Sequence, residues 1–166
     1  MGEVELKSGP QVVLFGAWYM GDVMAELVSL LRLPFAGFVD PQPAPWNNVI
    51  QPLPDQFRAG ISIGDPCVRR AVFDRLNASG RELVSLCHPT SVVSPSAQLE
   101  TGIYLAEQSI VRTAAVLGHG IHLHAGAMIS HHCVVEDFVT IGGGAVVASQ
   151  CKVGAESLIG AGAVLR

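Results

Sequence analysis

The sequence predicts two parts, a small α/β unit followed by a solenoid of short parallel strands. Strand and helix signals alternate up to about residue 87, and from Val93 onward every sixth residue is aliphatic. Most residues four positions after each aliphatic are small, which indicates tight corners between short strands. A period of six fits neither the period of about 3.6 of a helix nor the period of about 2 of a lone strand. Each hexad is therefore expected to form one flat side of a three-sided coil.

The hexads run without a miss or an insertion to the end of the chain. Three hexads make one coil of 18 residues, and successive coils are expected to stack at strand spacing, ~4.8 Å. Residues 93–164 then form four coils, with the aliphatic side chains pointing inward. The aliphatic positions are Val93, Leu99, Leu105, Val111, Leu117, Leu123, Ile129, Val135, Ile141, Val147, Val153, Ile159 and Leu165.

The beginning of the chain has the pattern of a Rossmann-like βαβ unit. A buried strand is predicted at residues 11–15, a glycine turn at 16–21, and a second strand at 35–39 that ends at Asp40. Strand, glycine turn, helix, strand and acidic residue follow each other in this order in dinucleotide-binding folds. The middle glycine of the G-x-G-x-x-G motif is absent, so the motif is only partly matched.

Two helices and two further strands complete this unit. Asp22 is predicted to cap the first helix, which runs to about Leu33, and the second helix covers residues 67–78. A third strand is expected at 59–63 and a fourth at 83–86. The inward face of the first helix is predicted to consist of Val23, Leu27, Leu30 and Leu31. We therefore expect a Rossmann-like domain at residues 1–87 and a β-helix at 88–166.

Composition excludes several functional classes. The 166 residues carry a net charge of −4 without a basic run, which makes nucleic acid an unsuitable partner. No stretch of 18 apolar residues is present, so no membrane span is predicted. The first seven residues lack the features of a signal peptide, and a cytoplasmic location is expected. The four cysteines are then reduced thiols, and Cys133 and Cys151, one coil apart, are interpreted as small core fillers.

Both parts together resemble the family of sialic acid O-acetyltransferases and bacillosamine-type sugar N-acetyltransferases. The resemblance implies a left-handed β-helix, acetyl-CoA as the acyl donor, a nucleotide-linked sugar held by the small domain, and homotrimers with active sites between subunits. The matching pieces are Gly16–Gly21, Phe38-Val-Asp40, Ser62-Ile-Gly-Asp65 with Arg69, His88-Pro-Thr-Ser91, Ser94-Pro-Ser-Ala97 and, most specifically, Ala127-Met-Ile-Ser-His-His-Cys-Val-Val-Glu-Asp-Phe138.

The resemblance places the catalytic base at His131. Acetyl transfer from a thioester needs a base for the proton of the attacking amine or hydroxyl, and a histidine suits this role near neutral pH. The family has a carboxylate directly after the base, where this chain has His132. Glu136 and Asp137 are therefore candidates for catalytic support from nearby.

The binding residues also follow from the resemblance. For the sugar substrate they are Gly16, Trp18, Tyr19, Met20, Asp40 and Gly64, and for acetyl-CoA they are Thr140 and Ala161. Bulky side chains fill the glycine turn, where the family has small polar residues. Thr140 stands where the family has a histidine. Family members also extend past the position of Leu165, so we expect an open last coil and weakened acetyl-CoA binding.

Two alternatives belong to other functional classes. His119 and His124 have the spacing of a metal-binding stretch in γ-class carbonic anhydrases, another trimeric hexapeptide-repeat family. A zinc site of that kind needs a third histidine. Thr101 and Ala106 occupy the corresponding positions one coil earlier, so no metal is expected. The other alternative is a non-catalytic β-helix that serves as a scaffold or binding protein.

Overall fold

The N-terminal part is a parallel four-stranded sheet with a helix on each face. The computed structural model describes residues 9–45, 47 and 49–166. Its strands β1 (Gln11–Phe15), β2 (Phe35–Val39), β3 (Phe57–Ile61) and β4 (Glu82–Leu83) are arranged in the order β2-β1-β3-β4. Helix α1 (Tyr19–Leu30) connects β1 to β2, and α2 (Pro66–Ala78) connects β3 to β4.

Strand β1 is buried on both faces, as its uninterrupted apolar sequence predicts. Val12 and Leu14 pack against α1, whereas Val13 packs with Phe73 and Leu76 of α2. The predicted bounds of β1 and β2 are confirmed, and β3 begins two residues before its predicted start.

The first helix starts earlier than predicted, and its inward face was predicted in part, since Leu27 is buried and Leu31 packs against the same core. The helix begins at Tyr19, because the chain enters it directly from the turn, and Trp18 occupies the N-cap position without a capping side chain. Arg32 adopts a left-handed conformation, with φ of 54°, shortly after the helix ends. Met24, Leu27 and Val28 form the buried face, while Val23 and Leu30 are exposed.

The predicted fourth strand at 83–86 is divided between two sheets. β4 completes the N-terminal sheet, whereas β5 (Leu86–Cys87) pairs with β8 (Tyr104–Leu105) of the β-helix. The backbone N–H of Val84 still donates to the carbonyl of Ala59, but the N–H of Leu86 donates to Ile103. The chain thus changes sheets within a few residues, and the first hexad position is Cys87 rather than Val93.

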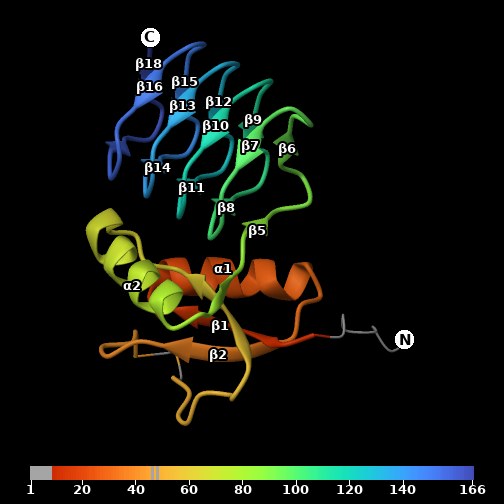
Figure 1. The fold of residues 1–166 in the computed structure, drawn as a ribbon, viewed down its shortest axis with the longest axis vertical. Coiled ribbons are helices and arrows are strands. Elements are labelled where there is room, and N and C mark those ends of the chain that lie inside the picture. Colours follow the sequence, from red (N-terminus) through yellow and green to blue (C-terminus); the bar gives the residue numbers. More distant parts are fainter. Residues whose placement is uncertain (1–8, 46, 48) are drawn as a thin grey trace.

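The C-terminal part is a three-sided parallel β-helix that extends away from the N-terminal sheet, with the C-terminus at its far end (Figure 1). Paired strands are 18 residues apart, as Val116 opposite Val134 illustrates. Its other strands are β6 (Val92–Val93), β7 (Gln98–Leu99), β9 (Ile110–Val111), β10 (Val116–Leu117), β11 (His122–Leu123), β12 (Met128–Ile129), β13 (Val134–Val135), β14 (Thr140–Ile141), β15 (Val146–Val147), β16 (Lys152–Val153), β17 (Leu158–Ile159) and β18 (Val164–Leu165).

The inward aliphatic row is confirmed along the centre of the β-helix. Every hexad position from Leu105 to Val153 is at most 3% exposed, and the row forms one continuous core. Leu99, Ile159 and Leu165 are partly buried against it, and Val93 is 37% exposed. No helix of the described residues is long and apolar enough to cross a membrane.

Candidate active site

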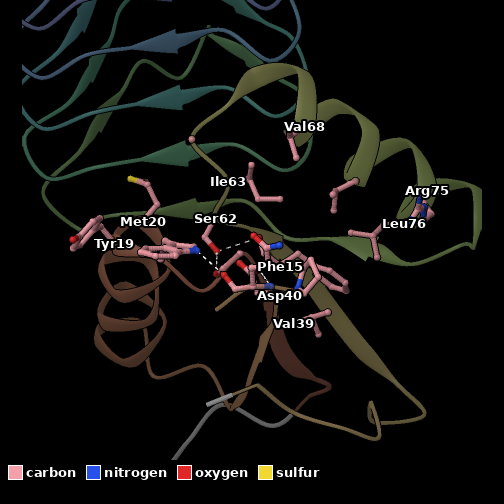
Figure 2. A pocket seen from close by; sticks show the side chains of 16 residues that line it. Phe15, Tyr19, Met20, Val39, Asp40, Ser62, Ile63, Val68, Arg75 and Leu76 are labelled. Atoms are coloured by element: carbon pink, nitrogen blue, oxygen red, sulfur yellow. Dashed lines mark hydrogen bonds between the residues drawn. The ribbon is translucent and has the colours of Figure 1, made fainter. Parts of the chain in front are cut away.

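A cavity of about 660 Å³ opens at the carboxyl ends of β1, β2 and β3. All the residues predicted to bind the sugar substrate line it, namely Gly16, Trp18, Tyr19, Met20, Asp40 and Gly64 (Figure 2). These residues come from separate segments of the chain, and the parallel sheet brings them together because the carboxyl ends of its strands meet at one edge.

The glycine turn that forms one wall is held by Asp40. Its carboxylate accepts hydrogen bonds from the backbone N–H groups of Ala17 and Gln42, both at 2.8 Å. Gly16 has φ of 113°, and a Cβ there would lie 2.8 Å from the carbonyl oxygen of Ser62. Asp40 therefore shapes the wall of the cavity, in addition to its predicted contact with substrate.

The other walls of the cavity are more apolar than the sequence indicated. Phe15, Val39 and Ile63 line it from the strand ends, and α2 contributes one basic residue, Arg75. The remaining apolar lining also comes from α2, as Val68, Val72 and Leu76. The sequence signal for these residues was the apolar face of a helix, which is equally typical of an ordinary core.

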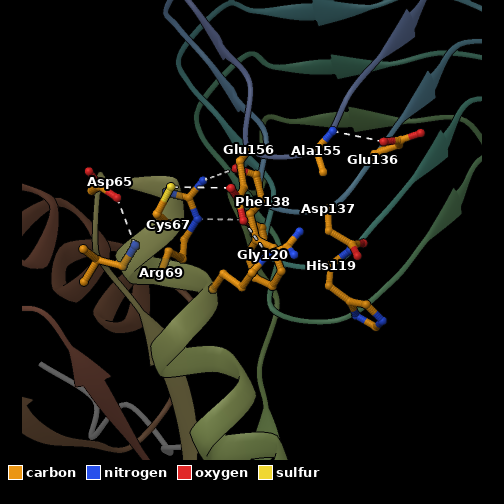
Figure 3. A network of polar contacts seen from close by, with 12 residues as sticks. Asp65, Cys67, Arg69, His119, Gly120, Glu136, Asp137, Phe138, Ala155 and Glu156 are labelled. Atoms are coloured by element: carbon orange, nitrogen blue, oxygen red, sulfur yellow. Dashed lines mark hydrogen bonds and ion pairs between the residues drawn. The ribbon is translucent and has the colours of Figure 1, made fainter.

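Arg69 joins the two parts of the molecule, and its role was not predicted. Its side chain is fully buried and donates to four backbone carbonyls and one hydroxyl. Figure 3 shows Arg69 beside Gly120 and Phe138 of the β-helix. The acceptors are Ile63 O, Gly64 O, Gly120 O, Phe138 O and Thr140 Oγ1, at 2.8–3.0 Å. Burial lowers the pKa of Arg69 to about 10, so it stays charged at neutral pH.

Thr140 lies at this junction, away from solvent. Its side chain is buried, and its hydroxyl accepts a hydrogen bond from Arg69 Nη2. In the single chain this side chain faces Arg69, and its contact with acetyl-CoA stays a prediction. Ala161, the other predicted contact, is exposed. It packs closely on Gly142, because a Cβ added at Gly142 would lie 2.6 Å from the backbone nitrogen of Ala161.

His131 lies exposed in the turn between β12 and β13. Its Nε2 is 2.7 Å from Ser149 Oγ, and its Nδ1 is 3.1 Å from Nδ1 of His132. Ser149 Oγ also lies 2.9 Å from Ser130 Oγ. His132 adopts a left-handed conformation with φ of 59°, which turns the two rings nearly perpendicular to each other, at 87°. These side chains form a continuous hydrogen-bonded chain at one corner of the β-helix.

Neither Glu136 nor Asp137 supports His131 within one chain. Glu136 pairs with Lys152 at 2.8 Å and accepts from the backbone N–H of Ala155. Asp137 accepts from the backbone N–H of His119 at 2.8 Å, so these two residues, 18 positions apart, lie side by side in neighbouring coils. Both carboxylates occupy the corner that follows the one carrying His131, because they lie about one hexad further along the chain.

The two histidines of the carbonic anhydrase alternative have separate surroundings. His119 contacts Thr101 and packs against Phe73, whereas His124 packs against Tyr104 and His122. In the described part of the chain, no group of three or more His, Cys, Asp or Glu side chains could hold a metal ion. The geometry therefore gives this alternative no support.

Burial determines the protonation of the histidines nearest the junction. Desolvation lowers the pKa of the fully buried His122 well below its ordinary value, and the charge on Arg69 lowers it further. Desolvation and Arg69 lower the pKa of His124 in the same way. Both rings are neutral at physiological pH, and His122 Nε2 lies 3.2 Å from the carbonyl oxygen of Ile61.

Comparison with known proteins identifies the repeat and its relatives. The model of the bacterial transferase hexapeptide family (six repeats) matches residues 132–166. The acetyltransferase domain of PglB from Neisseria gonorrhoeae, in complex with acetyl coenzyme A, is 27% identical with a TM-score of 0.82. The similarity covers 96% of this chain and 92% of that domain. The repeat at residues 132–166 and the similarity to the PglB domain support a sugar acetyltransferase family. The repeat and the three-sided coil fit the expected left-handed β-helix.

More distant structures share the fold across both parts of the chain. GDP-perosamine N-acetyltransferase from Caulobacter crescentus, in complex with CoA and GDP-perosamine, is 22% identical with a TM-score of 0.77, covering 98% of this chain and 91% of its own. WeeI from Acinetobacter baumannii is 16% identical with a TM-score of 0.71, covering 94% and 96%. No curated protein sequence matches the chain significantly.

Proposed function

We propose that the chain transfers the acetyl group of acetyl-CoA to an amino or hydroxyl group of a nucleotide-linked sugar. The observation that carries this proposal is the convergence of every predicted sugar-binding residue on one cavity. Structures similar to this chain hold acetyl-CoA, or CoA together with GDP-perosamine, which supports the same donor and the same class of acceptor.

The cavity has the features that a nucleotide sugar requires. The N-terminal unit acts as a Rossmann-like domain of residues 1–87, with the ligand at the carboxyl ends of its strands. The N-terminus of α1 borders the cavity, and the positive end of the helix dipole there suits the diphosphate. Apolar walls such as Phe15 and Ile63 suit the faces of a nucleobase.

His131 provides the base of the reaction in the β-helix domain of residues 88–166. It takes the proton of the attacking group, and His132 orients its ring in place of the family carboxylate. Backbone N–H groups at the exposed corner stabilise the oxyanion of the tetrahedral intermediate. Acetyl-CoA lies along the β-helix near Ala161. A homotrimer places the cavity of one subunit near the histidine corner of another, the corner of the β-helix that carries His131 and His132.

Acetyl-CoA turnover with a panel of nucleotide-linked amino and deoxyamino sugars tests the proposal. We expect CoA release that depends on one acceptor, with a product that is heavier by one acetyl group. The free sugars without nucleotide serve as controls for the role of the cavity, and light scattering measures the trimer. Absence of turnover with every acceptor, despite folded protein, would favour a non-catalytic β-helix.

A further inference from the structure

One of the three sides of the β-helix has an entirely apolar outer face. This side is the sheet β18-β15-β12-β9-β6, and its outward positions, which stack through strand pairing, are Val92, Ile110, Met128, Val146 and Val164. All five are at least partly accessible, and the two end positions are 59% and 58% exposed. The side β16-β13-β10-β7 carries Gln98 and Lys152 at the equivalent positions. A continuous apolar face is typical of a surface that binds another protein chain.

The two edges of this apolar face carry opposite charges at the same level. Glu107 lies in the corner just before β9, and Arg112 follows β9 in the next corner of the same coil. Both side chains are exposed, and among the described residues neither takes part in an ion pair. Complementary charges at opposite edges of one face suit a ring of identical subunits, in which one edge of each copy meets the other edge of the next.

A second cavity, of about 480 Å³, lies beside Glu107, between α1 and the first coil of the β-helix. Glu26 of α1 adds a second carboxylate, and Val23 and Leu30 add apolar walls that are 44% and 53% exposed. Tyr104 lines the cavity and is only 3% exposed, and its hydroxyl has no hydrogen-bond partner among the described residues. Burial and the charge of Glu107 raise the pKa of Tyr104 to about 12, so the hydroxyl stays protonated.

These groups match the two ends of an arginine side chain. The guanidinium donates to carboxylates, and charge-assisted hydrogen bonds of this kind are stronger than those between neutral groups. The hydroxyl of Tyr104 offers a further acceptor. The aliphatic stem of an arginine packs on apolar surface, which Val23 and Leu30 provide.

We propose that this cavity receives Arg112 of a second copy of the chain, an inference that rests on the homotrimer of the proposed function. The apolar sheet then faces the threefold axis. When that axis runs parallel to the β-helix, equal coils of the three copies lie at equal height, so Arg112 of one copy meets Glu107 of the next. His131 stands one coil above Arg112, ~5 Å farther from the N-terminal sheet. The contact therefore fixes the height of the histidine corner beside helix α1 of the neighbouring copy.

Charge reversal in the full chain tests this contact through the oligomeric state. Sedimentation velocity and light scattering over a range of protein concentrations measure dissociation of the trimer. Arg112→Glu and Glu107→Arg should each raise the concentration of half-dissociation at least about 100-fold, because like charges then face each other. The double variant should restore the wild-type value, since the pair forms again with reversed polarity. Arg166→Glu is the matched control, because it makes the same charge change at an exposed arginine of the last coil and should leave the trimer intact.

The outcomes separate this contact from the proposed reaction. Far-UV circular dichroism checks that each variant is folded, and both single changes are at exposed positions. A folded Arg112→Glu chain that dissociates like the wild type, a double variant that dissociates like the single ones, or a monomeric wild-type chain at micromolar concentration would overturn the proposal. Acetyl-CoA turnover is measured separately. A trimer with the expected charge dependence but without turnover would overturn the proposed function alone, and turnover by a trimer without that dependence would overturn the contact alone.

Discussion

The polar groups at the junction between the two parts are buried, whereas those at the histidine corner of the β-helix are exposed. Arg69 and His122 are fully buried, and the hydrogen bonds of Arg69 all go to other groups of the protein. His131, His132 and Ser149 are exposed and bond mainly to one another. Burial fixes the charge of the junction groups, whereas the corner groups are exposed to solvent.

Under the proposed function, the junction provides architecture and the histidine corner provides chemistry. The junction holds the Ile63–Gly64 wall of the cavity against Gly120 and Phe138 of the β-helix through a single arginine. Changes at the junction should therefore alter stability and substrate affinity. Changes at the corner should alter kcat.

Replacing Arg69 should have the largest effect on stability. Arg69→Met removes the donor from the buried acceptors Gly120 O, Phe138 O and Thr140 Oγ1, and each unsatisfied buried group costs ~1–3 kcal/mol. We expect the free energy of unfolding to fall by at least about 3 kcal/mol, measured by urea denaturation. Arg70→Met is the matched control, because Arg70 is partly exposed and its ion pair with Glu156 contributes about 1 kcal/mol or less. Equal losses for the two variants would contradict the role of the junction.

The buried His122 should make stability depend on pH. Its pKa is lowered in the folded state, so the unfolded chain binds more protons below the ordinary histidine pKa, about 6.5. Stability should therefore fall as pH decreases below about 6.5, by up to ~1.4 kcal/mol per pH unit for this one group. His122→Gln should flatten the slope in denaturation curves between pH 5 and 7, about the range where histidine titrates.

His88→Gln is the control for this measurement, because His88 lies on the surface with Thr90 as its partner. It should keep the wild-type slope. A slope that survives in His122→Gln would assign the pH dependence to another group, such as His124.

Replacing Gly64, which lines the cavity, should change the affinity for the sugar substrate. A Cβ at Gly64 meets no atom within 4 Å, and the residue does not need a left-handed conformation. Gly64→Val should therefore fold normally but fill space in the cavity, raising KM for the nucleotide sugar about 10-fold with little change in kcat. Initial rates at varied acceptor concentration measure this. An unchanged KM would place the sugar nucleotide elsewhere.

The smallest effect is expected for the carboxylate of Glu136. It is exposed and engaged by Lys152 and Ala155. Glu136→Gln should leave kcat and the unfolding midpoint unchanged within error in assays at moderate salt. A loss of kcat as large as that of a His131 variant would restore Glu136 as a supporting group, through contacts between subunits.

The sequence predicted the β-helix almost completely, because a period of six is unusual and the hexads follow one another without an insertion. The transition at Val84–Leu86 could not be read from the sequence, since a short apolar run is compatible with either sheet. The inward face of α1 was predicted only in part for a similar reason. Its apolar residues surround the helix, and packing against Val12 and Leu14 selects Met24 and Val28.

The candidate site was predicted unevenly. Motif resemblance located the residues of the cavity, because the turn and the strand ends are local features. It could not reveal that Arg69 engages Thr140, since this contact depends on the relative placement of two domains. Nor could it show that Ser149 meets His131, because a neighbouring coil supplies the serine 18 residues later.

The kcat of His131→Ala with the preferred sugar acceptor tests the assignment of chemistry to the exposed corner most directly. Loss of the group that transfers the proton should lower kcat by ~10²–10⁴-fold, with an unfolding midpoint equal to that of the wild type. His119→Ala, made in parallel, should retain nearly full activity. A His131→Ala chain that turns over at the wild-type rate would contradict the account.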